Sequence, residues 1–187
     1  MIETRSKYHA ASPAVNRWLR NQEITAHWFP TWRTPDRQRL LINVFLGSLG
    51  LGFFTAFAYL FLPQALLLWI PFTLLMCVSW TMLRVTIGSR DTAPLEVLDE
   101  YESAVMDQWR RRAYNGTAWS LFFMAFLMIC IGVHFGMRDG YTELLGNDPS
   151  SWMYFLGLIS LLLYLTFSSL PAIGYARNFP ASYPDNN

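Results

Sequence analysis

Ionisable side chains within the apolar parts of this sequence are the first candidates for chemistry, because such groups are rare in a membrane and usually functional. His134 lies near one end of a long apolar run, and Arg84 lies near the end of another. His134 could move a proton or donate a hydrogen bond to a quinone, although its position near Arg138 favours a place at the membrane surface. Arg84 could extend its guanidinium to anionic headgroups. The apolar runs contain no Asp or Glu, which disfavours a proton relay or a cation-coupled transporter.

The sequence contains no pattern that predicts a catalytic centre, a cofactor or a metal ion. The other two histidines, His9 and His27, lie in the N-terminal segment, so the histidine pair of a membrane b-type haem is missing. Cys77 and Cys130 lack the spacing of a zinc or redox motif. The carboxylates of Asp99–Glu102 have no neighbouring histidine and fit an exposed acidic helix face. Because P-loop, nucleophile-elbow, HExxH and CxxC motifs are also absent, we expect no enzyme activity.

Four long apolar segments must position any functional side chains of this protein. A span of about 20 helical residues crosses the roughly 30 Å hydrocarbon core of a bilayer. The first two segments are separated only by Pro63-Gln64, which predicts a tight transmembrane hairpin. The sequence therefore predicts an all-α integral membrane bundle of four helices, preceded by an arm over residues 1–39 and followed by a tail over residues 175–187. The predicted spans cover residues 40–62, 65–86, 118–137 and 152–174.

Basic residues predict the orientation of this bundle. Of the 14 lysines and arginines, only Arg138 falls on the side of the first hairpin turn and the loop between the third and fourth spans. The other side carries the remainder, and an excess of positive charge is typical of cytoplasmic loops. We therefore expect a multi-pass protein of the plasma membrane with both termini in the cytoplasm. The net charge of +1 does not favour nucleic acid as a partner.

The N-terminal arm is rich in aromatic residues. Ser12 followed by Pro13 predicts a helix start, and the helix should lie on the membrane surface with Trp18 on its apolar face. The next segment is too rich in proline and aromatic side chains for a helix. These aromatic residues fit either an anchor at the headgroup level or a docking surface for a partner subunit. The residues with this assignment are Trp18, Trp28, Phe29 and Trp32.

Between the second and third spans, residues 92–113 predict an amphipathic cytoplasmic helix. Its acids come early and its arginines come late, which complements the helix macrodipole. Trp109 falls near the apolar face, and a partner contact through this face is the alternative to a solvated connector. Arginines at the membrane boundary are expected to meet lipid headgroups. These arginines are Arg84, Arg110, Arg111 and Arg112.

Small residues at spacings of three or four mark possible helix-packing faces, because they let membrane helices approach closely. One face lies on the first span, a Gly-x-x-x-Gly pair lies on the third, and one glycine lies on the fourth. These faces could pack within the chain or against a neighbouring chain. The residues are Ser48, Gly52, Ala56, Gly132, Gly136 and Gly157.

The segments Leu98-Asp99-Glu100 and Arg112-Ala113-Tyr114 carry a resemblance to a group of proteins. The chain resembles small four-helix membrane proteins of actinobacteria, in which a similar acidic segment follows the second helix and an Arg-Ala-Tyr sequence precedes the third. Members of this group mostly have no assigned activity, so the resemblance implies an architecture and no catalytic residue. Some actinobacterial membrane proteins of this size accompany the respiratory cytochrome bcc–oxidase supercomplex, which implies an accessory role as one possibility.

Three functions follow as hypotheses. The first is a non-catalytic accessory or structural subunit of a larger membrane complex, with membrane lipids and unlike membrane subunits as its partners. The second is a self-assembling channel or carrier for a lipid or apolar solute. The third is a membrane enzyme or enzyme regulator acting from the cytoplasmic helix, which is the least favoured because no catalytic motif is present.

Overall fold

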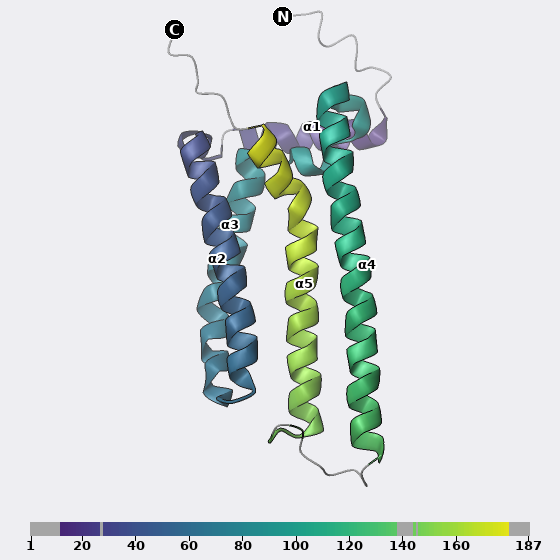
Figure 1. Cartoon of the computed structure of the whole chain (residues 1–187). Helices are drawn as coiled ribbons and strands as arrows, with labels where there is room; N and C mark the ends of the chain where they lie inside the picture. The colour runs from purple at the N-terminus through teal and green to yellow at the C-terminus, as the bar shows by residue number, and fades with distance from the viewer. Residues whose placement is uncertain (1–11, 27, 138–143, 145, 180–187) are drawn as a thin grey trace, which may run out of the picture.

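The structure is a computed structural model that describes residues 12–26, 28–137, 144 and 146–179. Within these residues the chain forms five α-helices and four short 3-10 helices. Four of the helices are long and apolar enough to cross a membrane. They run alternately up and down, while α1 (Pro13–Ala26) lies across one end of them (Figure 1). The prediction of an all-α protein with four long apolar helices is therefore confirmed.

Helices α2 (Pro35–Tyr59) and α3 (Trp69–Thr86) form the predicted hairpin. The 3-10 helix η3 (Pro63–Leu68) separates them, so the turn takes up the first residues of the second apolar run. Pro63 occupies the first position of this turn, where its missing N–H costs no hydrogen bond. The side chain of Asn147, which precedes α5, donates to the carbonyl of Leu60 (3.0 Å) and ties the hairpin tip to the last helix.

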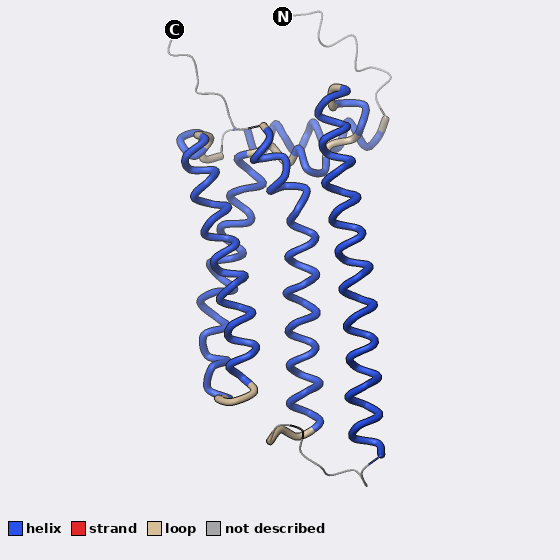
Figure 2. The backbone as a smooth tube through the Cα atoms, viewed as in Figure 1, coloured by secondary structure: helices blue, strands red, loops and turns tan. Residues whose placement is uncertain are grey.

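The second pair consists of α4 (Glu100–Met137) and α5 (Pro149–Asn178), which pack against each other. Helix α4 is continuous through Asn115 and Gly116, and Figure 2 shows an unbroken coil along the helix. Asp148 caps the start of α5 by accepting a hydrogen bond from the backbone N–H of Ser151 (2.9 Å). Helix α5 continues past Gly174, where the fourth span was predicted to end.

The hydrophobic core lies between α2, α3 and α5. Phe45, Phe72 and Leu162 contribute large buried side chains, one from each of these helices. Helix α4 stands at the side of this core and packs mainly on α5, as Figure 1 shows. The long helices are therefore a packed group of three with a fourth helix attached along one side.

The connection from α3 to α4 differs from its prediction. A helix was expected from about residue 92, but α4 begins at Glu100. Pro94 disfavours helical geometry in the residue before it, and Ala93 is extended (φ −61°, ψ 139°). Asp99 then caps α4, because its carboxylate accepts the backbone N–H of Glu102 (2.6 Å). Residues 87–99, called the connector below, contain the two short 3-10 turns Arg90–Thr92 and Leu95–Val97.

Candidate interaction surface

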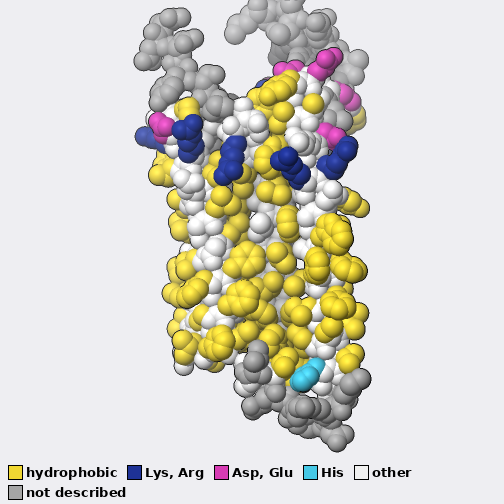
Figure 3. All heavy atoms as spheres, viewed as in Figure 1, with side chains coloured by type: hydrophobic (Ala, Val, Ile, Leu, Met, Phe, Trp, Pro, Cys, Tyr) yellow, Lys and Arg dark blue, Asp and Glu magenta, His cyan; other side chains and the backbone are white. Residues whose placement is uncertain are grey.

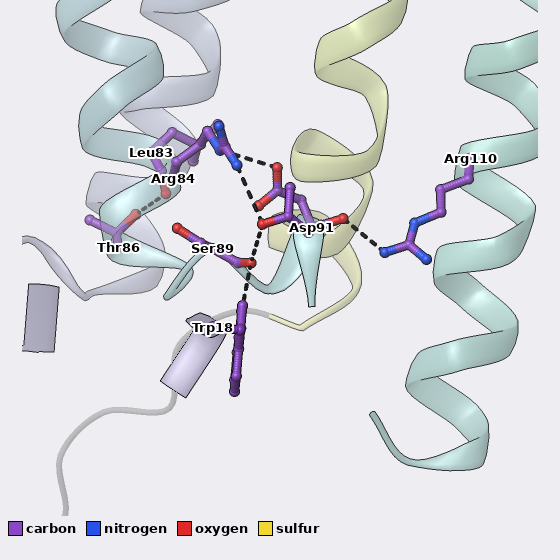
Figure 4. A network of polar contacts seen from close by, with 8 residues as sticks. Trp18, Leu83, Arg84, Thr86, Ser89, Asp91 and Arg110 are labelled. Atoms are coloured by element: carbon purple, nitrogen blue, oxygen red, sulfur yellow. Dashed lines mark hydrogen bonds and ion pairs between the residues drawn. The ribbon is translucent and has the colours of Figure 1, made fainter. Parts of the chain in front are cut away.

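Most charged side chains of the described residues lie at one end of the bundle, called the basic end below, where α2 begins and α3 and α5 end. Asp91 in the connector forms an ion pair with Arg84 at the end of α3, with 3.1 Å between Oδ2 and Nε. The backbone carbonyl of Asp91 accepts a hydrogen bond from Arg110 of α4 (3.0 Å). Figure 4 shows both arginines directed at Asp91 from opposite sides. The connector is thus held between α3 and α4.

A second set of contacts joins the connector to α1, α4 and α5. Trp18 of α1 donates its indole N–H to the carbonyl of Ser89 (3.3 Å). Arg90 lies over the Trp18 ring, with its central carbon 5.6 Å from the ring centroid, and pairs with Glu102 of α4 (3.4 Å). Glu102 also accepts the hydroxyl of Tyr175 of α5 (2.8 Å). These contacts fasten α1, the connector and the basic ends of α4 and α5 together.

Burial decides the electrostatics of Asp91. Its side chain retains 8% of its exposed surface, and that burial raises the pKa of the carboxyl above its ordinary value, while the charge of Arg84 opposes the shift. Removing a carboxylate from water disfavours its charged form. The ion pair therefore compensates part of the cost of burying Asp91. Arg84 depends less on the pair, because 35% of its side chain remains exposed to solvent.

The four arginines predicted at lipid headgroups have different surroundings. Arg84 and Arg110 contact the connector through Asp91, and Arg110 also donates to the carbonyl of Ala93 (3.3 Å). Arg111 forms a surface pair with Asp107 (3.5 Å), and the guanidinium of Arg112 lies over the ring of Trp109 (5.0 Å). Two of the four therefore join parts of the chain, while Arg111 and Arg112 are exposed.

The predicted aromatic contacts also divide into two groups. Trp18 is buried against the connector, and Trp109 packs against α5 at Gly174. Trp32 is half-buried with Arg37 over its ring (5.2 Å). Trp28 and Phe29 are about half exposed, at 50% and 48%. Only these last two side chains retain the exposure that an anchor or a docking surface needs.

The small residues of α2 and those of α4 and α5 differ in what faces them. Ser48, Gly52 and Ala56 are buried, and a Cβ on Gly52 would lie 2.9 Å from Leu162. The three glycines of α4 and α5 that were predicted as packing residues have no such neighbour, because a Cβ on each would meet no atom within 4 Å. These open glycines are Gly132, Gly136 and Gly157. The α2 face is used within the chain, and the glycine pair of α4 faces outward.

Two glycines that were not predicted as packing residues form the joint between α4 and α5. Gly116 of α4 receives the ring of Phe167, and Gly174 of α5 receives the ring of Trp109. The two contacts are reciprocal, since each helix contributes one glycine and one aromatic ring. In both helices an aromatic residue precedes the glycine by seven positions, Trp109 before Gly116 and Phe167 before Gly174. This shared spacing is the pattern from which the joint could have been predicted.

The side of α4 away from α5 is an apolar surface with no covering element in the described chain. It consists of residues spaced alternately by three and four, as expected for one face of a helix. Trp119, Phe122, Phe126 and Ile129 are each 60–64% exposed. Figure 3 shows hydrophobic side chains below the band of basic residues across the visible face of the protein. This surface, called the outer face of α4 below, comprises Trp119, Phe122, Phe126, Ile129, Val133 and Gly136, together with the exposed Gly132 beside them.

The described residues contain no group of three or more histidine, cysteine, aspartate or glutamate side chains that could hold a metal ion. His134 is half-buried, and its ring contacts that of Phe135 (5.6 Å between centroids). Arg138, its predicted neighbour, lies outside the described residues.

No protein-family model, curated protein or solved structure matches this chain.

Proposed function

We propose that the chain is a non-catalytic accessory or structural subunit of a larger membrane complex, and that the outer face of α4 contacts an apolar helix of an unlike subunit. One observation carries the proposal. None of the most apolar stretch of α4 is buried, whereas the corresponding share is 22–44% in the other three long helices. Because this stretch of α4 contributes so little to the core of its own chain, its apolar side chains can pack against a helix of another subunit.

The proposed place is the plasma membrane, with the basic end in the cytoplasm. The length and hydropathy of the four helices support insertion, and the charge asymmetry supports the orientation. The basic end includes Arg39, Arg84, Arg110 and Arg177, while the opposite end of the described helices carries no arginine or lysine.

An unlike partner is favoured over a second copy by the distribution of side-chain size along the outer face. Phe122 and Phe126 lie in one half of this face, and Gly132 and Gly136 lie in the other. Two copies related by a two-fold axis along the membrane normal would place like residues opposite each other. The phenylalanines would then keep the two helices apart in one half of the interface, and the glycines would leave a gap between the helices in the other half. An unlike helix can place small residues opposite the rings and large ones opposite the glycines.

A self-assembling channel or carrier is the second candidate. The observation that favours it is the open pair Gly132 and Gly136, because Gly-x-x-x-Gly is a common spacing in pairs of identical membrane helices. In that arrangement the copies would meet at the glycine half of α4 alone.

The test is recovery of the tagged protein from digitonin at its native expression level, followed by mass spectrometry. We expect a stoichiometric set of unlike membrane subunits, and their identity would show whether the complex is respiratory. The double variant Gly132→Leu/Gly136→Leu should lower the recovery of these subunits at least tenfold, because lipid tails accommodate leucine and a closely packed helix does not.

The matched control places the same two substitutions on the outward side of α2. Gly47→Leu/Gly50→Leu adds equal volume at positions where a Cβ meets no atom within 4 Å, and it should leave recovery unchanged. Recovery of the chain as a homo-oligomer that the α4 variant disrupts would favour the channel or carrier. Recovery of the chain alone and as a monomer would contradict both functions.

A further inference from the structure

A hollow of about 360 Å³ lies between the start of α2 and the end of α5. This volume falls within the range of about 300–1,000 Å³ that is typical of small-molecule sites. The hollow brings together two segments that are more than 130 positions apart in the sequence. It is lined by Pro35, Arg39, Ile42, Asn43, Ala176 and Arg177.

Two arginines face this hollow, and neither has a hydrogen bond or ion pair to a described residue. In this respect Arg39 and Arg177 differ from Arg84 and Arg110, which contact the connector. Asp36, the nearest acid on α2, does not line the hollow. Two guanidinium groups beside one small space repel each other, and an anion between them would turn that repulsion into attraction.

The rest of the lining suits a phosphate group attached to a less polar molecule. Ile42 and Ala176 are buried, at 3% and 5% exposure, and form an apolar floor. Asn43 is exposed and lies one turn after Arg39, so its amide can supply a neutral hydrogen-bond donor. The exposed Leu40 marks the start of the apolar run, which places the hollow at the boundary between charged and apolar residues.

We propose that this hollow is a binding site for a phosphate group, with Arg39 and Arg177 as its cationic ligands. Arginine presents a planar fork of N–H donors that matches two oxygens of one phosphate. The phosphate could belong to an anionic phospholipid at the membrane surface or to a free phosphate anion. The site does not depend on a partner subunit, so it can be tested on the isolated protein.

The experiment titrates the purified full chain, in a non-ionic detergent, with phosphatidylglycerol and separately with inorganic phosphate, and counts bound ligands by native mass spectrometry. We expect one phosphatidylglycerol to bind, in preference to phosphatidylcholine. Since an arginine near an anionic lipid contributes about fivefold in affinity, Arg39→Gln/Arg177→Gln should weaken binding about 25-fold. Arg39→Lys/Arg177→Lys should retain part of the affinity, because it keeps the charge and loses the fork.

The matched control is Arg17→Gln/Arg20→Gln, which removes two arginines from the exposed side of α1 and should bind as the wild type does. Saturable binding of inorganic phosphate alone, lost in Arg39→Gln/Arg177→Gln, would support the site with a soluble anion as its source. Equal weakening in both glutamine pairs would overturn the proposal, because the effect would then be one of general charge. Undiminished binding in Arg39→Gln/Arg177→Gln, or no binding of either ligand to the wild type, would also overturn it.

Discussion

Helices α2 and α4 carry the same kind of sequence signal and use it differently. On α2, Ser48, Gly52 and Ala56 lie four residues apart and are all buried within the chain. On α4, Gly132 and Gly136 have the same spacing and face no atom of the described chain. The difference lies in the neighbours, because Phe72 and Leu162 cover the α2 face, while α4 packs mainly against α5, on the side opposite to its outer face.

This contrast shows what small-residue spacing can indicate. A glycine stripe says that another helix can approach closely, but it does not say which helix will do so. That depends on the order in which the hairpins pack, which is a property of the whole fold. Substitutions that add the same volume to the closed α2 face and to the open α4 face should therefore have different effects on stability.

The largest effect is expected for Gly52→Leu. A Cβ at this position already lies 2.9 Å from Leu162 and 3.0 Å from Phe72, so a leucine forces α2 away from α3 and α5. Overpacking of this kind costs typically about 1–3 kcal/mol, and we expect about 3 kcal/mol or more here. Thermal unfolding in detergent, followed by circular dichroism, would measure the loss.

The control for Gly52→Leu is Gly132→Leu, which introduces the same side chain on the open face. We expect its melting temperature to equal or exceed that of the wild type, since leucine favours helix more than glycine does. If the two variants lost the same stability, the distinction between a closed and an open face would be wrong.

An intermediate effect is expected at the joint between α4 and α5. A Cβ on Gly116 would overlap the ring of Phe167, and one on Gly174 would overlap the ring of Trp109. Gly116→Ala and Gly174→Ala should each cost about 1–2 kcal/mol, because the overlap is partly offset by the better helix propensity of alanine. Gly157→Ala, on the open side of α5, should stabilise the protein slightly. A gain of stability in all three variants would show that the rings move aside freely.

The long helices could be predicted from the sequence because apolar run length and turn residues are local signals. The arm helix from Pro13 and the turn at Pro63 follow from the same kind of information. The predicted start of α4 was wrong because the spacing of apolar residues alone suggested a helix from about residue 92, whereas α4 begins at Glu100. Pro94 and the capping carboxylate of Asp99 argued for a later start.

The polar contacts could not be predicted, because they depend on residues far apart in the chain. The sequence predicted Arg84 and Arg110 at lipid headgroups, and their contacts with Asp91 become evident only once the connector is placed between them. Gly88 and Ser89 give the one local hint, since both adopt left-handed backbone geometry (φ 62° and 51°) directly after α3. The turn that they make directs Asp91 back toward Arg84. The direction of such a turn cannot be predicted from the sequence.

The smallest effect is expected at the Arg84–Asp91 pair, and it distinguishes arginines used within the chain from those left open. Arg84→Gln leaves the buried carboxylate of Asp91 without its cation and should cost about 1 kcal/mol at neutral pH. This lies below the roughly 3–5 kcal/mol of a fully buried pair, because 35% of the Arg84 side chain is exposed. Asp91→Asn should cost less, since burial already favours the neutral form of this side chain, and the backbone carbonyl that Arg110 contacts remains.

The pH dependence of these two variants gives the sharper measurement. Because the pKa of Asp91 is raised in the folded protein above its ordinary 3.8, the folded state holds this proton more tightly than the unfolded chain does. The favourable contribution of that proton is complete below about pH 3.8 and is lost as the pH rises through the folded-state pKa. Arg84→Gln raises the folded-state pKa further, so its cost should be small near pH 4 and full near pH 7, whereas the cost of Asp91→Asn should not grow in this way. Melting temperatures at the two pH values would show this divergence. A cost of Arg84→Gln that is the same at both values would mean that Arg84 acts through its packing on Trp80, over whose ring it lies at 5.9 Å, and that its charge contributes little.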